Sequence, residues 1–191
     1  MSDPVEVLDF WLGEVGEEGW YKGGEDLDGE IRDRYQELCL AARDGGLDHW
    51  VEGAAPTLAY LIVTDQFPRN IWRGDAQAFA TDAMALSAAR RAIEAGWDME
   101  VPEPVRQFFY LPMMHSEDPA DQQDCIALFA ERMPETGASN LLHARAHAEV
   151  IARFGRFPYR NDALGRETTE AEQEFLDAGG YISVVKELQS A

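Results

Sequence analysis

Apolar residues recur along most of the chain at the three- and four-residue spacings of an α-helix, and strand-like alternation is almost absent. One clear helical face ends before a Gly-Gly pair and consists of Ile31, Tyr35, Leu38 and Ala42. A longer, alanine-rich pattern is expected to bury Phe79, Ala83, Leu86 and Ile93. Together the patterns predict about eight helical segments, at or near residues 3–12, 31–44, 56–67, 75–95, 104–111, 119–133, 139–154 and from 169, followed by a short C-terminal segment at 181–188.

The predicted helix ends rest on proline, glycine and capping residues. Gly13 is expected to end the first helix, and Pro68 and Pro112 are expected to end two later ones, because proline lacks the N–H that a helix interior needs. Asp65 occupies the apolar stripe just before Pro68. A Thr-x-x-Glu capping box predicts a helix start at Thr169.

The connections between the predicted helices are short, which favours one all-α domain of antiparallel helix pairs over residues 1–191. A chain of 191 residues is long enough to bury most of its apolar surface around a single core.

Composition narrows the class of protein. The chain has 46% hydrophobic residues, a formal net charge of −20 and two cysteines, Cys39 and Cys125. The hydrophobic content is typical of a globular fold, and the negative charge disfavours nucleic acid as a partner. No apolar run approaches the roughly 20 residues that span a bilayer, and the cysteines form no disulfide or zinc pattern. We expect a cytoplasmic protein with no membrane partner, no metal and no cofactor.

Positive charge is concentrated in arginine. The chain has 14 Arg and two Lys, and residues 143–166 hold five Arg and two His against Glu149 and Asp162. A short string also occurs twice, as Phe67-Pro68-Arg69-Asn70 and as Phe157-Pro158-Tyr159-Arg160-Asn161. Because Arg captures carboxylate and phosphate groups through paired hydrogen bonds, its selective use indicates fixed partners.

One hypothesis is a site for a small phosphate- or carboxylate-bearing molecule. Its predicted ligand-binding residues are Asp65, Arg69, Asn70, Arg73, His147, Arg153, Arg156, Arg160, Asn161 and Arg166. If the site performs chemistry, the candidates for proton transfer are His115, Glu117 and His143. No sequence signature defines a reaction, so catalysis is left open.

The alternative hypothesis is a helical scaffold that binds a protein or peptide, with the arginines as internal ion-pair struts. It expects part of the aromatic surplus to be exposed, with Trp20 or Trp50 as candidates. The doubled string also has a purely structural interpretation, in which Phe anchors a turn and Pro ends a helix.

Two smaller patterns also have structural alternatives. His143 and His147 lie one helical turn apart, which is compatible with a shared metal, but they lack the central Glu of the H-E-x-x-H motif and border an apolar stripe. The loop residues Ser116, Glu117 and Asp118 suit acid–base chemistry and equally suit a helix N-cap.

Several longer motifs occur together in one order: Asp9-Phe10-Trp11, Asp65-Gln66-Phe67-Pro68-Arg69-Asn70, Pro112-Met113-Met114-His115-Ser116-Glu117, Arg153 to Asn161, and Leu164-Gly165-Arg166. From about residue 5 to residue 176 the chain resembles an uncharacterised bacterial family, the domain of unknown function numbered 924. The resemblance implies an all-α fold grouped with the tetratricopeptide-like superhelices and no established activity. One departure is Tyr159, where the family often has His, and this disfavours an obligatory proton carrier there.

Overall fold

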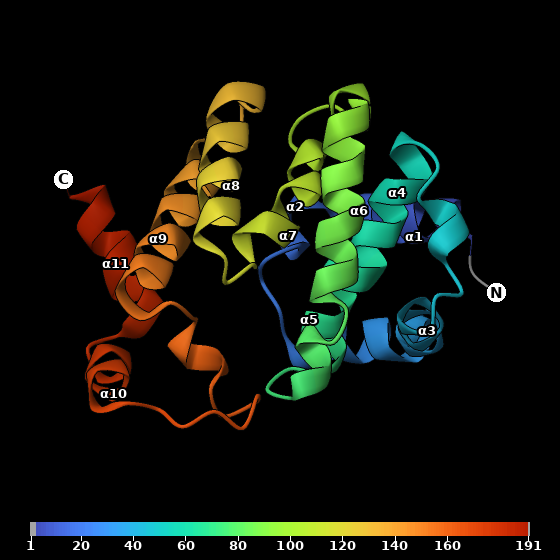
Figure 1. Cartoon of the computed structure of the whole chain (residues 1–191). Helices are drawn as coiled ribbons and strands as arrows, with labels where there is room; N and C mark the ends of the chain where they lie inside the picture. The colour runs from blue at the N-terminus through green and yellow to red at the C-terminus, as the bar shows by residue number, and fades with distance from the viewer. Residues whose placement is uncertain (1–2, 191) are drawn as a thin grey trace. The chain divides into compact units, whose positions relative to one another are not determined.

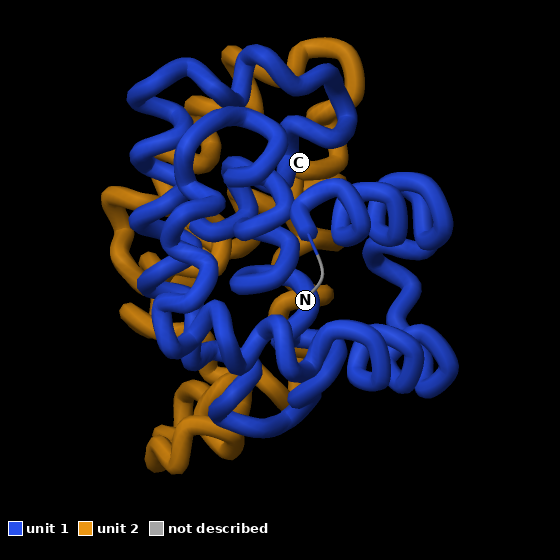
Figure 2. Tube along the Cα trace, turned by 90° about the vertical axis from the view of Figure 1, so that its right-hand side faces the viewer, with its two compact units in different colours: residues 1–112 blue, residues 113–191 orange. Residues whose placement is uncertain are grey.

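The computed structural model describes residues 3–190, and every regular element in that part of the chain is helical (Figure 1). The all-α class predicted from the sequence is therefore confirmed. The chain divides into two compact units, residues 1–112 and residues 113–191, which are coloured separately in Figure 2. We describe each unit by itself, and a single domain over the whole chain stays a prediction.

Over its described residues, 3–112, unit 1 has six α-helices linked by shorter helical segments. The α-helices are α1 (Pro4–Leu8), α2 (Gly16–Gly19), α3 (Glu25–Arg43), α4 (Ala54–Leu61), α5 (Phe67–Ile71) and α6 (Asp82–Ala95). Two π-helical segments cover Asp9–Val15 and Ile62–Gln66, and 3-10 segments cover Asp48–Trp50, Ala76–Phe79, Trp97–Glu100 and Val105–Phe109. The helix α7 (Leu111–Met114) contains the boundary between the units.

The core of unit 1 is built from aromatic rings around Phe67, which is fully buried. Its ring centroid lies 4.8 Å from that of Tyr35, 5.5 Å from that of Trp11 and 6.1 Å from that of Phe10. Tyr35 lies on the buried face of α3, whose four predicted core residues are all buried. The first copy of the doubled string therefore begins with a residue at the centre of the core.

The expectation that Trp20 or Trp50 is exposed was wrong. Trp20 is 7% exposed and Trp50 is 5% exposed. The Trp20 indole packs edge-on against Phe108 with centroids 4.9 Å apart, and its N–H donates to the carbonyl oxygen of Trp11 at 2.8 Å. Both indole rings belong to the hydrophobic core. They therefore do not support a surface that binds a partner.

Pro68 does not end its helix, contrary to the expectation from the sequence. The chain runs from α4 through the π-helical segment Ile62–Gln66 into α5, and Pro68 lies in the first turn of α5. In a regular α-helix the N–H of residue 68 would bond the carbonyl oxygen of Thr64. That oxygen instead accepts the hydroxyl hydrogen of Thr81 at 2.6 Å. The π-helical turn and Thr81 together make proline acceptable inside a continuous helical path.

Gly13 and Pro112 also fail to end a helix. Gly13 lies inside the π-helical segment Asp9–Val15, and the chain turns only at Gly16, whose φ of +63° favours glycine. Pro112 is the second residue of α7, where the missing N–H has no partner to lose. In both places the chain stays helical by changing its hydrogen-bond spacing or by starting a new helix.

The buried face of α6 also differs from the prediction. Its buried residues are alanines at 85, 88, 89 and 92, whereas Ala83 is exposed and the larger Leu86 and Ile93 are half-buried. Helix α6 packs against α4, and small side chains allow close approach of two helices. The alanine stripe was overlooked because the prediction gave weight to the larger apolar residues.

Unit 2 matches the predicted helix boundaries closely. It contains α8 (Pro119–Arg132), α9 (Ala138–Phe154), α10 (Glu170–Asp177) and α11 (Gly180–Gln189), with a 3-10 turn at Pro158–Arg160. Helix α9 packs against both α8 and α11, and α8 and α9 lie side by side in Figure 1. The capping box at Thr169 is confirmed. The core is a cluster of Ala146, Val150, Ile151, Phe157, Phe175, Val184 and Val185.

Candidate functional site

The predicted site residues of unit 1 are held by internal carboxylates. Both terminal nitrogens of Arg69 donate to Oδ1 of Asp82 at 3.0 Å, and one also donates to the backbone oxygen of Asp65 at 2.8 Å. The Asp65 carboxylate, whose residue is 1% exposed, lies 3.6 Å from Arg69. This aspartate therefore fits the apolar stripe because an arginine from the next turn offsets its charge.

Asn70 and Arg73 share a second carboxylate, that of Asp28 on α3. The amide of Asn70 donates to Asp28 at 2.8 Å, and Arg73 donates through two nitrogens at 2.9 and 3.0 Å. Burial alone would raise the pKa of Asp28, but these hydrogen bonds outweigh it and the pKa is lowered. The first copy of the doubled string thus ties α5 to α3.

In unit 2, Arg156 forms a two-point ion pair with Glu172. The Arg156 nitrogens lie 2.6 and 2.7 Å from the two carboxylate oxygens, and the Glu172 side chain is 3% exposed. Glu172 also accepts the backbone N–H of Thr169 in the capping box and a hydrogen bond from Asn161. Hydrogen bonding from Arg156 is the main reason that the pKa of Glu172 falls to about 2.

Glu117 organises the other end of the second string. It accepts two-point hydrogen bonds from Arg166, the closest at 2.8 Å, and the backbone N–H of Phe157 at 2.8 Å. Burial would raise the pKa of Glu117, but these donors lower it. Arg166 also donates to the side-chain oxygen of Asn161. A charged, fully engaged carboxylate of this kind suits a structural role better than proton transfer.

Arg153 lies apart from these networks on the surface of α9. It pairs with Glu149 on its own helix at 2.8 Å and with Glu187 of α11 at 3.3 Å. The predicted ligand-binding arginines are thus divided between the units: Arg69 and Arg73 in unit 1, and Arg153, Arg156, Arg160 and Arg166 in unit 2.

Four of the predicted site residues gather around α9 together with two tyrosines that were not predicted. We call His115, His143, His147, Tyr159, Arg160 and Tyr181 the histidine cluster; it contains three of the four histidines of the chain. The imidazole of His143 is hydrogen-bonded through Nδ1 to the hydroxyl of Tyr181. The ring of Tyr181 in turn lies 4.6 Å, centroid to centroid, from that of His147.

Arg160 supplies the positive charge of the histidine cluster. The residue is 5% exposed, and its guanidinium lies 4.6 Å from the ring centre of Phe157 and 5.8 Å from that of Tyr159. It donates to the carbonyl oxygen of His115 at 3.0 Å. Cation–π contacts of this kind hold a guanidinium in place. The charge of Arg160 also contributes to the lowered pKa of Glu117.

The protonation state of His147 follows from its surroundings. Its Nδ1 lies 2.9 Å from the carbonyl oxygen of His143, and since a carbonyl only accepts, Nδ1 carries the hydrogen and Nε2 carries the lone pair. Burial, with smaller contributions from His115, Arg160 and His143, lowers the pKa of His147 to about 3. Burial also lowers the pKa of His143. Both imidazoles are neutral at pH 7 and can exchange hydrogen bonds with a ligand.

Sequence reasoning did not assign a site role to Tyr159 or Tyr181. Tyr159 is 46% exposed at the second string, and Tyr181 lies in the first turn of α11, 38 residues after His143. Tyr159 belongs to the second copy of the doubled string, so the sequence contained a signal for it. No local sequence pattern indicates that Tyr181 lies beside α9. Among residues 3–190, no group of three or more His, Cys, Asp or Glu side chains is placed to hold a metal ion.

The comparisons with known proteins agree on one class. A solved structure, of a protein of unknown function from Agrobacterium tumefaciens, is 41% identical with a TM-score of 0.85, and the match covers 92% of this chain and 97% of that one. No curated protein matches the chain. The chain is thus an all-helical protein of a bacterial class whose function is unknown. The model of the family "Bacterial protein of unknown function (DUF924)" matches residues 7–180, so the chain belongs to DUF924. No helix among the described residues is long and apolar enough to cross a membrane.

Proposed function

We propose that unit 2 binds a small phosphate- or carboxylate-bearing molecule at the histidine cluster. The observation that carries the proposal is the position of Arg160, which donates to the carbonyl oxygen of His115 and whose charge, after the larger effect of burial, contributes to the low pKa of His147. An anion placed there relieves this electrostatic cost, because it stabilises both the guanidinium and a proton on a neighbouring imidazole.

The proposed ligand site is smaller than the one expected from the sequence. Arg69, Arg73, Arg153, Arg156 and Arg166 each have a carboxylate within 4 Å, which supports a structural role for them as ion-pair struts. The residues assigned to the ligand are Arg160, which binds the anion, and His143, His147 and Tyr159, which accept or donate hydrogen bonds at its edge. No reaction is assigned to the cluster.

Histidine NMR tests this proposal. Inorganic phosphate and acetate are titrated into protein whose imidazole resonances are assigned, and the pKa of His147 is followed at each concentration. We expect a saturable shift of the His147 resonances and a rise in the pKa of His147, because a bound anion favours the imidazolium. If no resonance of the three clustered histidines responds to either probe, the proposal is wrong.

Variants distinguish the cluster from general binding of anions. Arg160→Gln should abolish the response, whereas Arg145→Gln, an exposed arginine of the same helix α9 as His147, should leave it unchanged. Because Arg160 is buried, its loss also affects folding, so Tyr159→Ala, at a position that is 46% exposed, provides a second variant. A retained response in both cluster variants would contradict the assignment.

A helical scaffold for a protein or peptide is the second candidate function. The internal ion pairs favour its claim that most arginines are struts, and its tetratricopeptide-like superhelix stays a prediction. A pull-down with the full chain tests it: the scaffold predicts one partner recovered at a fixed ratio, and its absence counts against this candidate.

A further inference from the structure

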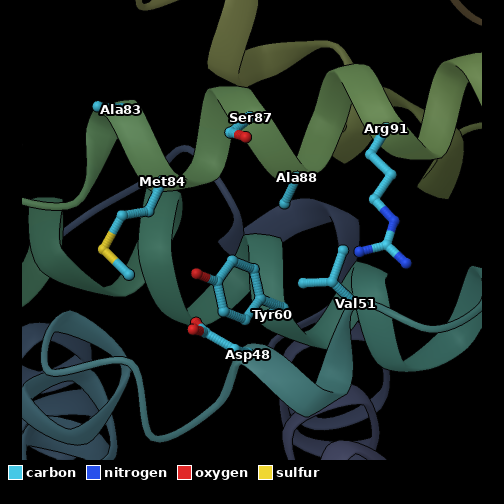
Figure 3. A pocket seen from close by; sticks show the side chains of 8 residues that line it. All are labelled: Asp48, Val51, Tyr60, Ala83, Met84, Ser87, Ala88 and Arg91. Carbon is cyan, nitrogen blue, oxygen red and sulfur yellow. The ribbon is translucent and has the colours of Figure 1, made fainter.

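Unit 1 contains an open hollow that takes no part in the proposed function. Its lining has polar groups toward both ends and apolar side chains between them (Figure 3). It has a volume of about 490 Å³ and lies between α6 and the segment that contains Asp48 and Val51, with Tyr60 of α4 at its floor (Figure 3). In Figure 3, the guanidinium of Arg91 lies at one end of the hollow, and the carboxylate of Asp48 lies beside the Tyr60 hydroxyl toward the other.

The charged groups of this hollow differ from the paired charges elsewhere. No residue among 3–190 forms a hydrogen bond or an ion pair with the side chain of Arg91 or of Asp48; the side-chain contact of Arg91 is with the ring of Trp97, 5.8 Å away. Both residues are exposed. Opposite charges thus border one hollow without neutralising each other.

The floor of the hollow is apolar, with one polar group. Tyr60 is 3% exposed, Val51 is 8% exposed and Ala88 is 5% exposed, and Met84 is half-buried. No described residue hydrogen-bonds to the Tyr60 hydroxyl, although the ring is buried. Burial, and to a smaller extent the charge of Asp48, raises the pKa of Tyr60, so the hydroxyl is neutral and can donate or accept.

The length of the hollow limits the size of an occupant. Met84 and Arg91 are seven residues apart on α6, which corresponds to about 10 Å along the helix axis. An extended peptide advances about 3.3–3.6 Å per residue. About three residues therefore span the stretch from Met84 to Arg91.

We propose that this hollow binds a short peptide of at most about three residues with free termini. Arg91 binds the terminal carboxylate through the guanidinium, and Asp48, with the hydroxyl of Tyr60 as acceptor, binds the terminal ammonium. A central apolar side chain lies on Val51 and Ala88 and loses its contact with water there. Each end of the ligand thereby meets a charge that the protein itself leaves unpaired.

The experiment uses the full chain and four probes: the tripeptide Ala-Leu-Ala, its N-acetylated form, its C-amidated form, and free leucine. Backbone amide NMR gives the dissociation constant and the position of binding. Ala-Leu-Ala is expected to shift resonances of residues 82–91 saturably, and each capped form and free leucine are expected to bind at least tenfold more weakly, the ratio that corresponds to about 1.4 kcal/mol. Absence of saturable shifts with Ala-Leu-Ala, or equal binding of either capped form, overturns the proposal.

Variants test the two ends separately. Arg91→Gln should weaken the binding of Ala-Leu-Ala at least tenfold and leave the binding of the C-amidated peptide unchanged. Asp48→Asn should also weaken the binding of Ala-Leu-Ala at least tenfold and leave the binding of the N-acetylated peptide unchanged. Because both side chains are exposed and unpaired, neither variant should lower the melting temperature. Glu94→Gln, at an exposed position of α6, is the matched control and should bind like the wild type. If Arg91→Gln and Glu94→Gln bind Ala-Leu-Ala equally, the site is not the one described.

Discussion

The ion pair of Arg156 and Glu172 is the sharpest test of whether the arginines of unit 2 act as struts. Its two hydrogen bonds, at 2.6 and 2.7 Å, join the end of α9 to the first turn of α10. The residue Glu172 is 3% exposed, so removal of Arg156 leaves a buried carboxylate without its main partner. The perturbation of interest is therefore Arg156→Met, which keeps the aliphatic stem and removes the charge.

The expected loss of stability follows from the burial of Glu172. A buried acceptor that loses its hydrogen-bond partner costs about 1–3 kcal/mol, and more when it is charged. The pKa of Glu172, which falls from 4.5 to about 2, shows that its surroundings favour the charged carboxylate. Arg156 contributes the largest part but is partly exposed, and Thr169 supplies a further share. We expect Arg156→Met to lower the free energy of unfolding by about 2 kcal/mol, which corresponds to a melting temperature lower by about 4–8 °C in a chain of this size.

The pH dependence of this contribution has a definite sign. The folded-state pKa of Glu172 is depressed, so its stabilisation is fully present above the unfolded value of 4.5 and is lost as the pH falls toward 2. At pH 7 the effect of Arg156→Met is therefore at its maximum.

A double-mutant cycle measures the pair itself. Urea unfolding of the wild type, Arg156→Met, Glu172→Gln and the double variant at pH 7 should give a coupling energy of about 2 kcal/mol. Arg153→Met is the matched control, since the exposed pair of Arg153 with Glu149 should contribute less than about 1 kcal/mol. A coupling energy below about 0.5 kcal/mol would refute the assignment of Arg156 as a strut.

Three further predictions follow from contacts elsewhere in the chain. Thr81→Val should lower the free energy of unfolding by about 1–3 kcal/mol in urea titrations, because the buried carbonyl oxygen of Thr64 beside Pro68 loses its donor; no loss would show that this bond is dispensable. Arg69→Met should lower the melting temperature more than Arg73→Met does, since the side chains are 21% and 60% exposed, and the reverse order would contradict the described burial. Below pH 6.5 the unfolded state binds a proton at His147 that the folded state excludes down to about pH 3, so the free energy of unfolding should fall as the pH is lowered from 6.5 to about 3. His147→Gln should reduce this fall in urea titrations, and a variant with the same pH profile as the wild type would contradict the prediction.

The fold was predictable where local chemistry decides the outcome. The helices of unit 2 begin and end within about two residues of the predicted positions, because Pro119, Gly155 and the Thr169 capping box act within one turn of the backbone. The outcome at Pro68 was not predictable in this way. Its helix continues because a hydroxyl from Thr81, a residue outside that helix, satisfies the displaced carbonyl.

The candidate site was predictable only as a set of residue types. The sequence identifies arginine as the cation that seeks fixed partners, but the partner of Arg166 is Glu117, 49 residues away, and that of Arg73 is Asp28, 45 residues away. Such pairs depend on how helices pack. The neighbourhood of His143 and Tyr181 arises in the same way, from the contact between α9 and α11.

The double role of Glu117 has a consequence for recognition. This carboxylate holds the backbone of Phe157 and the side chain of Arg166, which lie on either side of Arg160 in the chain. The turn that carries Arg160 is thus fixed at both ends before any ligand arrives. The anion proposed to bind there would not have to order this loop, so little conformational entropy would be lost on binding.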